Sequence, residues 1–189
     1  MNVMVSIAFI YAVVTIHELG HYYAAKCTGV HVLEVCIGNG PRLFSWKTQR
    51  SGTVFTVRLL PFSGYNYVQM IPNGCRRRAV RRKSFDGQTN WKQAIILSAG
   101  CLANAIGAIV IACYLADNSG CSIESALRYG MRIFSYTAVM NLVPVGKTDG
   151  ARLFKLLLSC REKADQQVQY RRWNTQQGYR PQYTWSKNN

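Results

Sequence analysis

The sequence predicts an α-helical polytopic membrane protein, with a core of three transmembrane helices and a small antiparallel β-sheet between the first and the second. Three observations predict this fold class. Long uncharged segments alternate with densely basic ones, and one of them is long enough to cross a bilayer. Between the first two spans, the composition is that of short strands. With 189 residues, 49% of them apolar, the chain suffices for one core and is not disordered by composition.

The first predicted span covers about residues 1–25. It is uncharged through Ile16 and then carries His17, Glu18 and His21 near its end. Ionisable groups are costly within a membrane helix and by default indicate a functional site. No basic residues precede the apolar stretch, which argues against a cleaved secretory signal.

The second predicted span, residues 94–116, has no charged residue over 23 positions, whereas about 20 apolar residues are enough for a membrane helix. Small residues recur in it every four positions, which favours close helix contact in lipid. They form two rows, Ala99, Ala103 and Gly107, and Gly100, Asn104, Ala108 and Ala112. Asn104 is therefore expected to point inward.

A third span is predicted at residues 127–158. It is weaker than the others because Arg128, Arg132, Lys147 and Asp149 shorten its uncharged centre. It crosses the bilayer only if the two arginines lie near one interface, where their long side chains reach water.

Basic residues are distributed unevenly around these spans. Residues 26–92 hold twelve lysines and arginines and the tail from Ala151 holds eight, whereas the loop 117–125 holds none. Because Lys and Arg are retained in the cytosol, this loop and the N-terminus are predicted to lie outside. The ionisable residues near the span ends then lie toward the cytosolic side.

Residues 30–37 and 53–60 are short runs rich in valine, threonine and aliphatic residues. Turn-forming residues separate them, namely Gly38, Gly40, Pro41 and Gly52. We therefore expect a small antiparallel sheet within residues 30–68.

The basic charge is concentrated in two further places. Residues 76–83 hold six lysines and arginines, which attract anionic lipid at about 1 kcal/mol each near a membrane surface. Residues 161–189 are polar and basic, and we expect a flexible cytosolic tail there, after a membrane-embedded core formed by residues 1–160. The overall net charge of +15 excludes a typical acidic cytosolic enzyme.

The clearest chemical signal is the HExxH motif His-Glu-Leu-Gly-His in the first span. Positions i and i+4 share a helix face, so His17 and His21 can bind one metal ion with Glu18 beside it. A catalytic zinc ion has three protein ligands and an open position, so a third ligand is required. Asp149 is the best candidate, because it is the only other acidic residue at a cytosolic span end and Gly150 permits close backbone approach.

An alternative interpretation needs no metal ion. The two histidines would then be satisfied polar residues, and Asp149 a helix-end charge paired with Lys147. Two histidines and a glutamate at membrane depth favour the metal site. The seven cysteines form no CxxC pair and suggest neither a disulfide framework nor a cysteine zinc site.

Several motifs resemble those of the site-2 protease type of intramembrane zinc metalloproteases. Residues 15–21, Thr-Ile-His-Glu-Leu-Gly-His, look like the zinc-binding helix, and residues 141–150, Asn-Leu-Val-Pro-Val-Gly-Lys-Thr-Asp-Gly, like the family's NxxP…DG element. Residues 60–65, Leu-Pro-Phe-Ser-Gly-Tyr, resemble its membrane-dipping loop, and residues 99–104, Ala-Gly-Cys-Leu-Ala-Asn, its AGPxxN element. The resemblance covers residues 13–158.

The sequence departs from the family's pattern in three places. Cys101 replaces the usual proline, Ser63 replaces the first loop glycine, and residues 146–148, Gly-Lys-Thr, replace the usual Pro/Leu-rich approach to the aspartate. A cation at position 147 either weakens zinc binding or extends to the interface.

The resemblance implies a three-helix transmembrane catalytic core of the minimal type, without a PDZ domain, in a bacterial-type plasma membrane. Its implied function is regulated intramembrane proteolysis, the hydrolysis of peptide bonds in or next to transmembrane segments of single-span membrane proteins. Zn2+ held by His17, His21 and Asp149 would polarise the scissile carbonyl and lower the pKa of water, and Glu18 would take the water proton.

The resemblance also implies residues that bind substrate. The loop around Gly64 would hold the substrate in an extended conformation at a strand edge. Asn104 and Asn141 either hydrogen-bond this extended substrate or hold the third span in place.

The rival interpretation is a catalytically inactive membrane adaptor that binds anionic lipid or a partner protein through residues 76–83. The intact Glu18 argues against it. No nucleic-acid partner is expected, because membrane topology and lipid attraction account for the basic charge.

Overall fold

The computed structural model describes residues 3–71, 78–118, 120, 123–146 and 148–161. The chain divides into two units, residues 1–153 and 154–189. The first unit contains the helices and strands that form the candidate site, and it is described below. Most of the predicted flexible tail, residues 162–189, lies outside the described residues.

The first two predicted spans are continuous helices. Helix α1 covers Val3–Cys27 and helix α3 covers Asn90–Asp117, and both are long and apolar enough to cross a membrane. In the described part of the chain these are the two helices that meet this criterion. Helix α1 ends two residues later than predicted, and α3 is five residues longer than the predicted span, because helical hydrogen bonding continues into the flanking polar residues.

The prediction of a single third span at residues 127–158 is wrong. Helix α4 covers Glu124–Leu142 and ends there, and residues 149–161 form a separate helix. Pro144 explains the break, because proline disfavours helical geometry at the preceding residue, and Val143 is accordingly extended, with ψ of 128°. Gly146, with φ of +65°, then turns the chain in the left-handed region.

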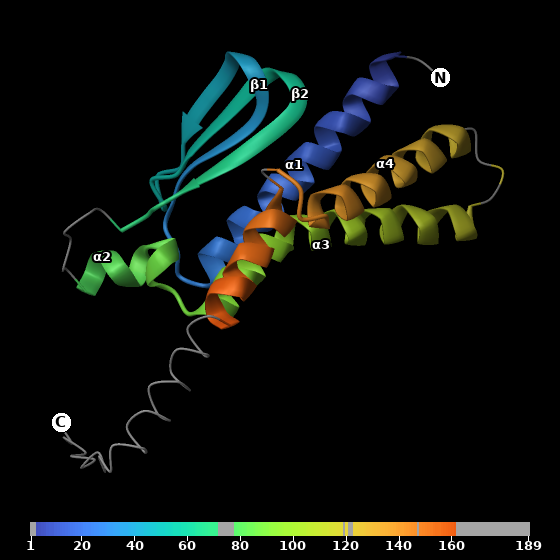
Figure 1. Cartoon of the computed structure of the whole chain (residues 1–189). Coiled ribbons are helices and arrows are strands. Elements are labelled where there is room, and N and C mark those ends of the chain that lie inside the picture. Colours follow the sequence, from blue (N-terminus) through green and yellow to red (C-terminus); the bar gives the residue numbers. More distant parts are fainter. Residues whose placement is uncertain (1–2, 72–77, 119, 121–122, 147, 162–189) are drawn as a thin grey trace, which may run out of the picture. The chain divides into compact units, whose positions relative to one another are not determined.

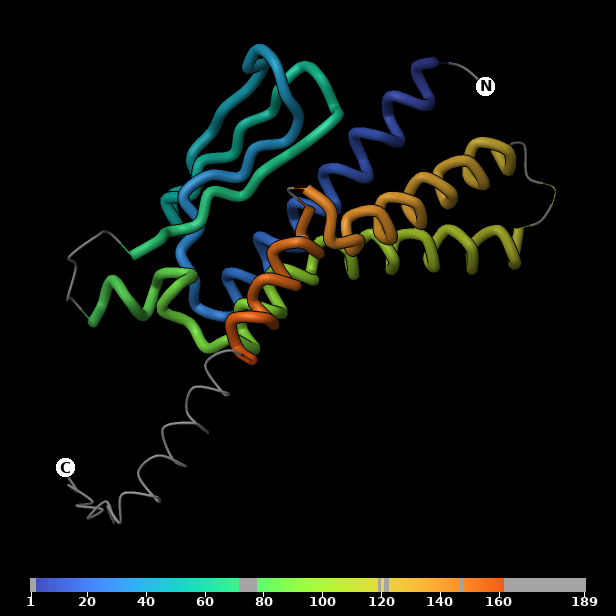
Figure 2. Tube along the Cα trace, in the orientation of Figure 1, coloured from blue at the N-terminus to red at the C-terminus, as the bar shows by residue number. Residues whose placement is uncertain are grey.

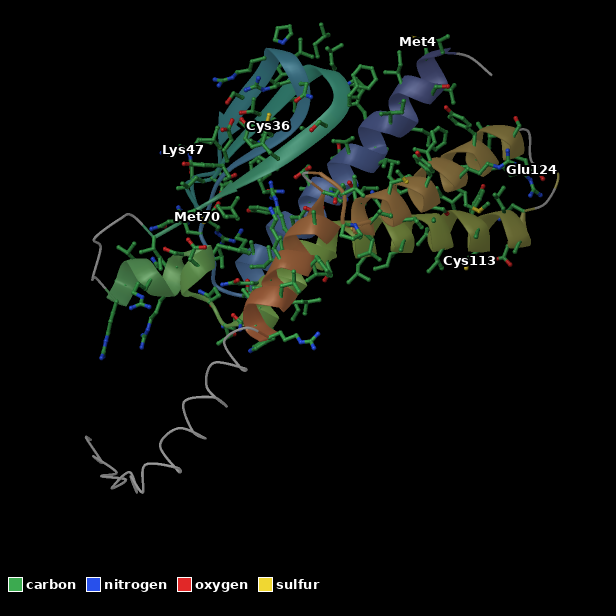
Figure 3. All side chains as sticks on the ribbon, in the orientation of Figure 1. Met4, Cys36, Lys47, Met70, Cys113 and Glu124 are labelled. Atoms are coloured by element: carbon green, nitrogen blue, oxygen red, sulfur yellow. The ribbon has the colours of Figure 1, made fainter. Side chains whose placement is uncertain are left out.

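Helices α3 and α4 lie side by side and run in opposite directions (Figure 2). Figure 3 shows Cys113 and Glu124 at the same end of this pair. Gly107 of α3 faces the ring of Phe134 of α4, and a Cβ atom at Gly107 would lie 2.8 Å from its Cε1 atom. This contact confirms the predicted role of small residues in α3.

Helix α1 approaches α3 just as closely. A Cβ atom at Gly20 would lie 2.7 Å from the carbonyl oxygen of Ala99 and 2.8 Å from the Cβ atom of Ala103. Gly20 is the fourth residue of the HExxH motif, so the small-residue face brings the motif directly against α3.

The predicted antiparallel sheet is present, but its boundaries differ. Strand β1 covers Val32–Lys47 and strand β2 covers Val54–Val68, so the turn lies at residues 48–53 near Gly52, whereas Gly38, Gly40 and Pro41 lie within β1. Gly38 and Gly40 have φ of +90° and +84° and bend the strand at irregular register positions without ending it. The sequence therefore places glycines correctly at a bend but not at the end of the strand.

The first half of β1 is paired on both sides. Val35 pairs with Phe55 and with Asn66, and Ile37 pairs with Gly64. The predicted membrane-dipping loop is accordingly the second half of β2, hydrogen-bonded to β1. Figure 1 shows the two strands beside α1, which both strands contact.

A buried apolar cluster holds the sheet against the helices. It contains Tyr22 and Ala25 of α1, Val32 and Val35 of β1, and Ile96 of α3. Burial of such side chains contributes about 1.5–3 kcal/mol each. Because Tyr22 directly follows His21, this cluster fixes the sheet next to the HExxH motif.

The basic cluster follows the sheet. Its residues 78–83 form the short helix α2, Arg78–Lys83, which has no buried residues, and residues 76 and 77 lie outside the described residues. The amide of His31 donates to the carbonyl of Lys83 at 2.9 Å, which attaches the end of α2 to the start of the sheet.

Tyr11 of α1 attaches the sheet at a second point, since its hydroxyl donates to the carbonyls of Arg58 and Leu59 at 2.5 and 2.6 Å.

We predict that Tyr11→Phe loosens the sheet and lowers the apparent Tm in detergent by a few degrees, because a hydrogen bond contributes about 0.5–1.5 kcal/mol. Proteolysis in the turn 48–53 should become faster. Tyr23→Phe is the control, because Tyr23 is 60% exposed. An equal effect of both variants would contradict the attachment.

Candidate active site

The three ionisable residues of the HExxH motif are buried near the end of α1. His17, Glu18 and His21 are 8%, 6% and 8% exposed. Helix α3 covers the histidines and strand β2 contacts the glutamate. Such burial is costly for polar groups unless they have partners, so the partners of each side chain are informative.

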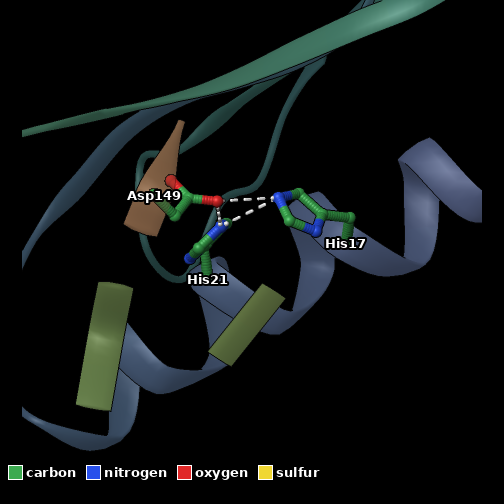
Figure 4. A group of neighbouring side chains, drawn as sticks. All are labelled: His17, His21 and Asp149. Atoms are coloured by element: carbon green, nitrogen blue, oxygen red, sulfur yellow. Dashed lines mark hydrogen bonds and ion pairs between the residues drawn. The ribbon is translucent and has the colours of Figure 1, made fainter. Parts of the chain in front are cut away.

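Asp149 completes a tight cluster with the two histidines (Figure 4). Its Oδ2 atom lies 3.0 Å from Nε2 of His17 and 3.1 Å from Nε2 of His21, and the two Nε2 atoms lie 3.2 Å apart. The structure thus brings together residues that are 132 and 128 positions apart in sequence.

The bend after α4 places Asp149. The Thr148 hydroxyl donates to the carbonyl of Val143 at 2.7 Å and accepts from the amide of Ala151 at 3.2 Å, so Thr148 caps the helix that begins at Asp149. A Cβ atom at Gly150 would lie 2.0 Å from the carbonyl oxygen of Leu142. Only glycine fits there, which supports the close approach expected from the sequence. Lys147, the alternative partner of Asp149, lies outside the described residues.

The tautomer of His21 follows from its partner on α3. Its Nδ1 atom lies 2.7 Å from the carbonyl oxygen of Ile96, which can only accept, so Nδ1 carries the hydrogen. In the neutral ring Nε2 then directs a lone pair toward the carboxylate of Asp149. Histidines that bind metal ions use the second nitrogen in this way, to orient the ring.

His17 has a partner on its other nitrogen as well. Its Nδ1 atom lies 3.5 Å from the amide of Asn104, which is completely buried and also donates to the hydroxyl of Thr137 at 3.2 Å. Asn104 therefore links α1, α3 and α4 directly behind a candidate ligand. Asn141 lies in the last turn of α4, and no side-chain hydrogen bond of it is found within the described residues.

The donor set fits a divalent metal ion. Two imidazole nitrogens and a carboxylate oxygen are typical zinc ligands, and bonds of about 2.0–2.1 Å in a tetrahedron separate ligand atoms by about 3.3 Å. The observed separations of 3.0, 3.1 and 3.2 Å are close to this value. Three such atoms at these distances require either a cation between them or protons on the ring nitrogens, and the donor set accommodates a zinc ion.

Gly100 of α3 leaves the space that the imidazoles occupy. A Cβ atom there would lie 2.4 Å from Nε2 of His21 and 2.7 Å from Cε1 of His17. The sequence pattern identifies Gly100 as a helix-packing residue, and the structure adds that its missing side chain accommodates the candidate ligands.

Glu18 faces the sheet. A Cβ atom at Gly64 of β2 would lie 2.6 Å from its Cγ atom, and the amide nitrogen of Asn66 donates to its Oε2 at 2.7 Å. Gly64 was expected near the site, whereas the sequence pattern does not identify Asn66. A single asparagine in a strand carries no local signal, because its partner is 48 residues away.

We predict that Gly100→Ala lowers zinc affinity about 10- to 100-fold, because its methyl group would displace both imidazoles. Zinc content after dialysis against a graded chelator measures this. Gly107→Ala is the matched control on the same helix as Gly100, because its methyl group would meet only the ring of Phe134 of α4. Equal zinc retention in the two variants would show that Gly100 does not shape the site.

Comparison with known proteins gives consistent matches. A zinc metalloprotease of Clostridium perfringens, named as putative, is 35% identical over 109 residues, 58% of this chain and 31% of that protein. Protease RseP of Yersinia pestis is 39% identical over 108 residues, which cover 54% of this chain and 23% of that protein. Metalloprotease MmpA of Caulobacter vibrioides is 35% identical over 127 residues, which cover 57% of this chain and 32% of that protein. The chain thus spans a third or less of these relatives' length.

The model of peptidase family M50, the site-2 protease family, matches residues 5–137. This region is more than half of the chain and contains His17, Glu18 and His21. The family resemblance of the motifs is thereby confirmed, and the chain belongs to peptidase family M50.

Proposed function

We propose that this chain is the catalytic core of an intramembrane zinc metalloprotease, which hydrolyses peptide bonds in or next to transmembrane segments of membrane proteins. One observation carries the proposal: the Nε2 atoms of His17 and His21 and Oδ2 of Asp149 meet within 3.2 Å at the end of an apolar helix. Membership of peptidase family M50 and relatives named as zinc metalloproteases support it.

In this proposal His17, His21 and Asp149 hold the metal ion. Zn2+ bound there supplies a Lewis acid for the scissile carbonyl and acidifies the attacking water molecule. Ile96 and Asn104 orient the two imidazoles, and Gly100 leaves room for them.

Glu18 is the proposed general base. It directly follows His17 in α1 and is held among buried groups rather than solvated, which suits a carboxylate that must take a proton from water and return it to the leaving amine. Burial also excludes bulk water from the reacting groups.

The second half of β2 is the proposed substrate-binding edge. Residues 64–68 pair with β1 along one edge of this strand segment. Gly64 and Asn66 also contact Glu18, the proposed base. A substrate segment added here in extended form would present its peptide bond to Glu18. Asn141 remains a candidate for substrate binding, whereas the contacts of Asn104 favour its alternative role of holding α4 and His17.

The membrane arrangement is also part of the proposal. Helices α1 and α3 cross the bilayer, with the N-terminus outside and the site toward the cytosolic side of a plasma membrane, as the distribution of basic residues indicates. The exposed basic residues of α2 contact anionic lipid head groups. Single-span membrane proteins are the proposed substrates.

We predict that Glu18→Gln abolishes turnover while zinc remains bound, because the amide preserves shape but cannot accept the proton. In cells expressing the variant, intact or partly trimmed single-span proteins should accumulate relative to the wild type. Glu124→Gln is the control, since Glu124 lies at the start of α4 and pairs with Arg128. Near wild-type turnover by Glu18→Gln would remove Glu18 as the base. Zinc-loaded wild type that cleaves no membrane protein would favour the inactive adaptor.

Asp149→Ala should lower zinc occupancy, because only the two imidazoles of α1 then remain as protein ligands. Metal analysis of the purified protein by mass spectrometry measures the effect, with Asp117→Ala, at the end of α3, as the control. Unchanged zinc content would exclude Asp149 as a ligand.

A further inference from the structure

We infer that Asn66 is a positioning residue, which fixes the carboxylate of Glu18 in one orientation through two hydrogen bonds from a single amide group. The inference rests on the proposed function, because it gives Asn66 its role through the general base. Nothing in the HExxH motif itself specifies how this carboxylate is oriented.

The amide of Asn66 contacts Glu18 twice. Its Nδ2 atom lies 2.7 Å from the carboxylate atom Oε2 and 2.9 Å from the main-chain carbonyl oxygen of the same residue. Both partners can only accept, so the nitrogen must face them and the orientation of the amide is determined by chemistry. The two N–H groups thus join the backbone of Glu18 to the end of its side chain.

This closed arrangement restricts the side-chain torsions of Glu18. A glutamate has three such torsions, and their loss on ordering costs free energy that a single exposed hydrogen bond does not offset. Here both ends of the side chain are tied to one rigid amide. The strand that carries Asn66 is itself fixed, because Asn66 pairs with the completely buried Val35.

Gly64 limits the carboxylate from a second direction. A Cβ atom there would lie 2.7 Å from Oε1 and 2.8 Å from Cδ of Glu18, so the backbone of β2 lies close against the carboxyl group. Oε2 is engaged by Asn66, whereas no hydrogen bond to Oε1 is found within the described residues. Oε2 therefore anchors the carboxylate, and the backbone at Gly64 limits how far Oε1 can rotate about it.

The amide oxygen of Asn66 indicates that stability alone does not explain why an asparagine occupies this position. Its Oδ1 atom is buried and has no hydrogen-bond partner in the described part of the chain. An unpaired buried acceptor costs free energy, and such exceptions are associated with functional constraints. An apolar residue would avoid this cost but would leave Glu18 without a donor.

The test compares purified, zinc-loaded Asn66→Asp and Asn66→Ala with the wild type. Asn66→Asp keeps the shape of the side chain but replaces the donor by a carboxylate facing that of Glu18. Asn39→Ala is the matched control, because Asn39 is exposed in β1. Three quantities are measured: zinc content, apparent Tm, and the affinity for a peptide hydroxamate, which binds zinc and hydrogen-bonds to the general base. Where a single-span substrate is cleaved, kcat and KM are added.

We expect both Asn66 variants to retain zinc and to lose hydroxamate affinity and kcat about 10- to 100-fold, with KM within about twofold, since a base displaced by about 1 Å costs this much. In a Glu18→Gln background, Asn66→Ala should cause no further loss of hydroxamate affinity. Loss of zinc, a Tm decrease that accounts for the effect, or wild-type behaviour of Asn66→Asp would overturn the inference.

The same measurements separate this inference from the proposed function. A wild type that cleaves no membrane protein, but whose hydroxamate affinity depends on both Asn66 and Glu18, would contradict the protease function and support the positioning role. A wild type that cleaves normally and is insensitive to Asn66 substitution would contradict only the positioning role.

Discussion

The fold depends on bringing three electron-rich atoms to one point inside an apolar environment. Nε2 of His17, Nε2 of His21 and Oδ2 of Asp149 approach favourably only with a cation between them or with protons on the ring nitrogens. The neighbouring glycines make this close approach sterically possible. Gly20, Gly100 and Gly150 have no side chains where helix α3, an imidazole pair and the end of α4 would otherwise collide with their neighbours. The elements therefore pack closely near the site because glycines replace larger residues there, which matters in lipid, where little hydrophobic force draws helices together.

Around this point, each histidine is oriented by an element other than its own, whereas Asp149 is held at the capped start of its own helix. A carbonyl of α3 fixes the ring of His21, Asn104 of α3 contacts His17, and Thr148 caps the helix of Asp149. Glu18, the proposed general base, is held by β2 instead.

The features of the fold and site that could be predicted from the sequence are those that depend on local residue patterns. The i, i+4 spacing of His17 and His21 and the two apolar runs require no knowledge of tertiary structure, and Asp149 was inferred from topology. Asn66 was not found, because its role arises from a contact between a strand and a helix. The third span was predicted as one helix because its hydrophobicity was averaged across Pro144, whose backbone restriction prevailed.

The bend between α4 and Asp149 divides the ligand set unequally. The two proposed ligands His17 and His21 lie on one helix, whereas the proposed third ligand, Asp149, follows the short segment 143–148, which is largely exposed where described. For the proposed metal site, the effective concentration of the Asp149 carboxylate at the ion would be set by the conformation of this segment rather than by α1.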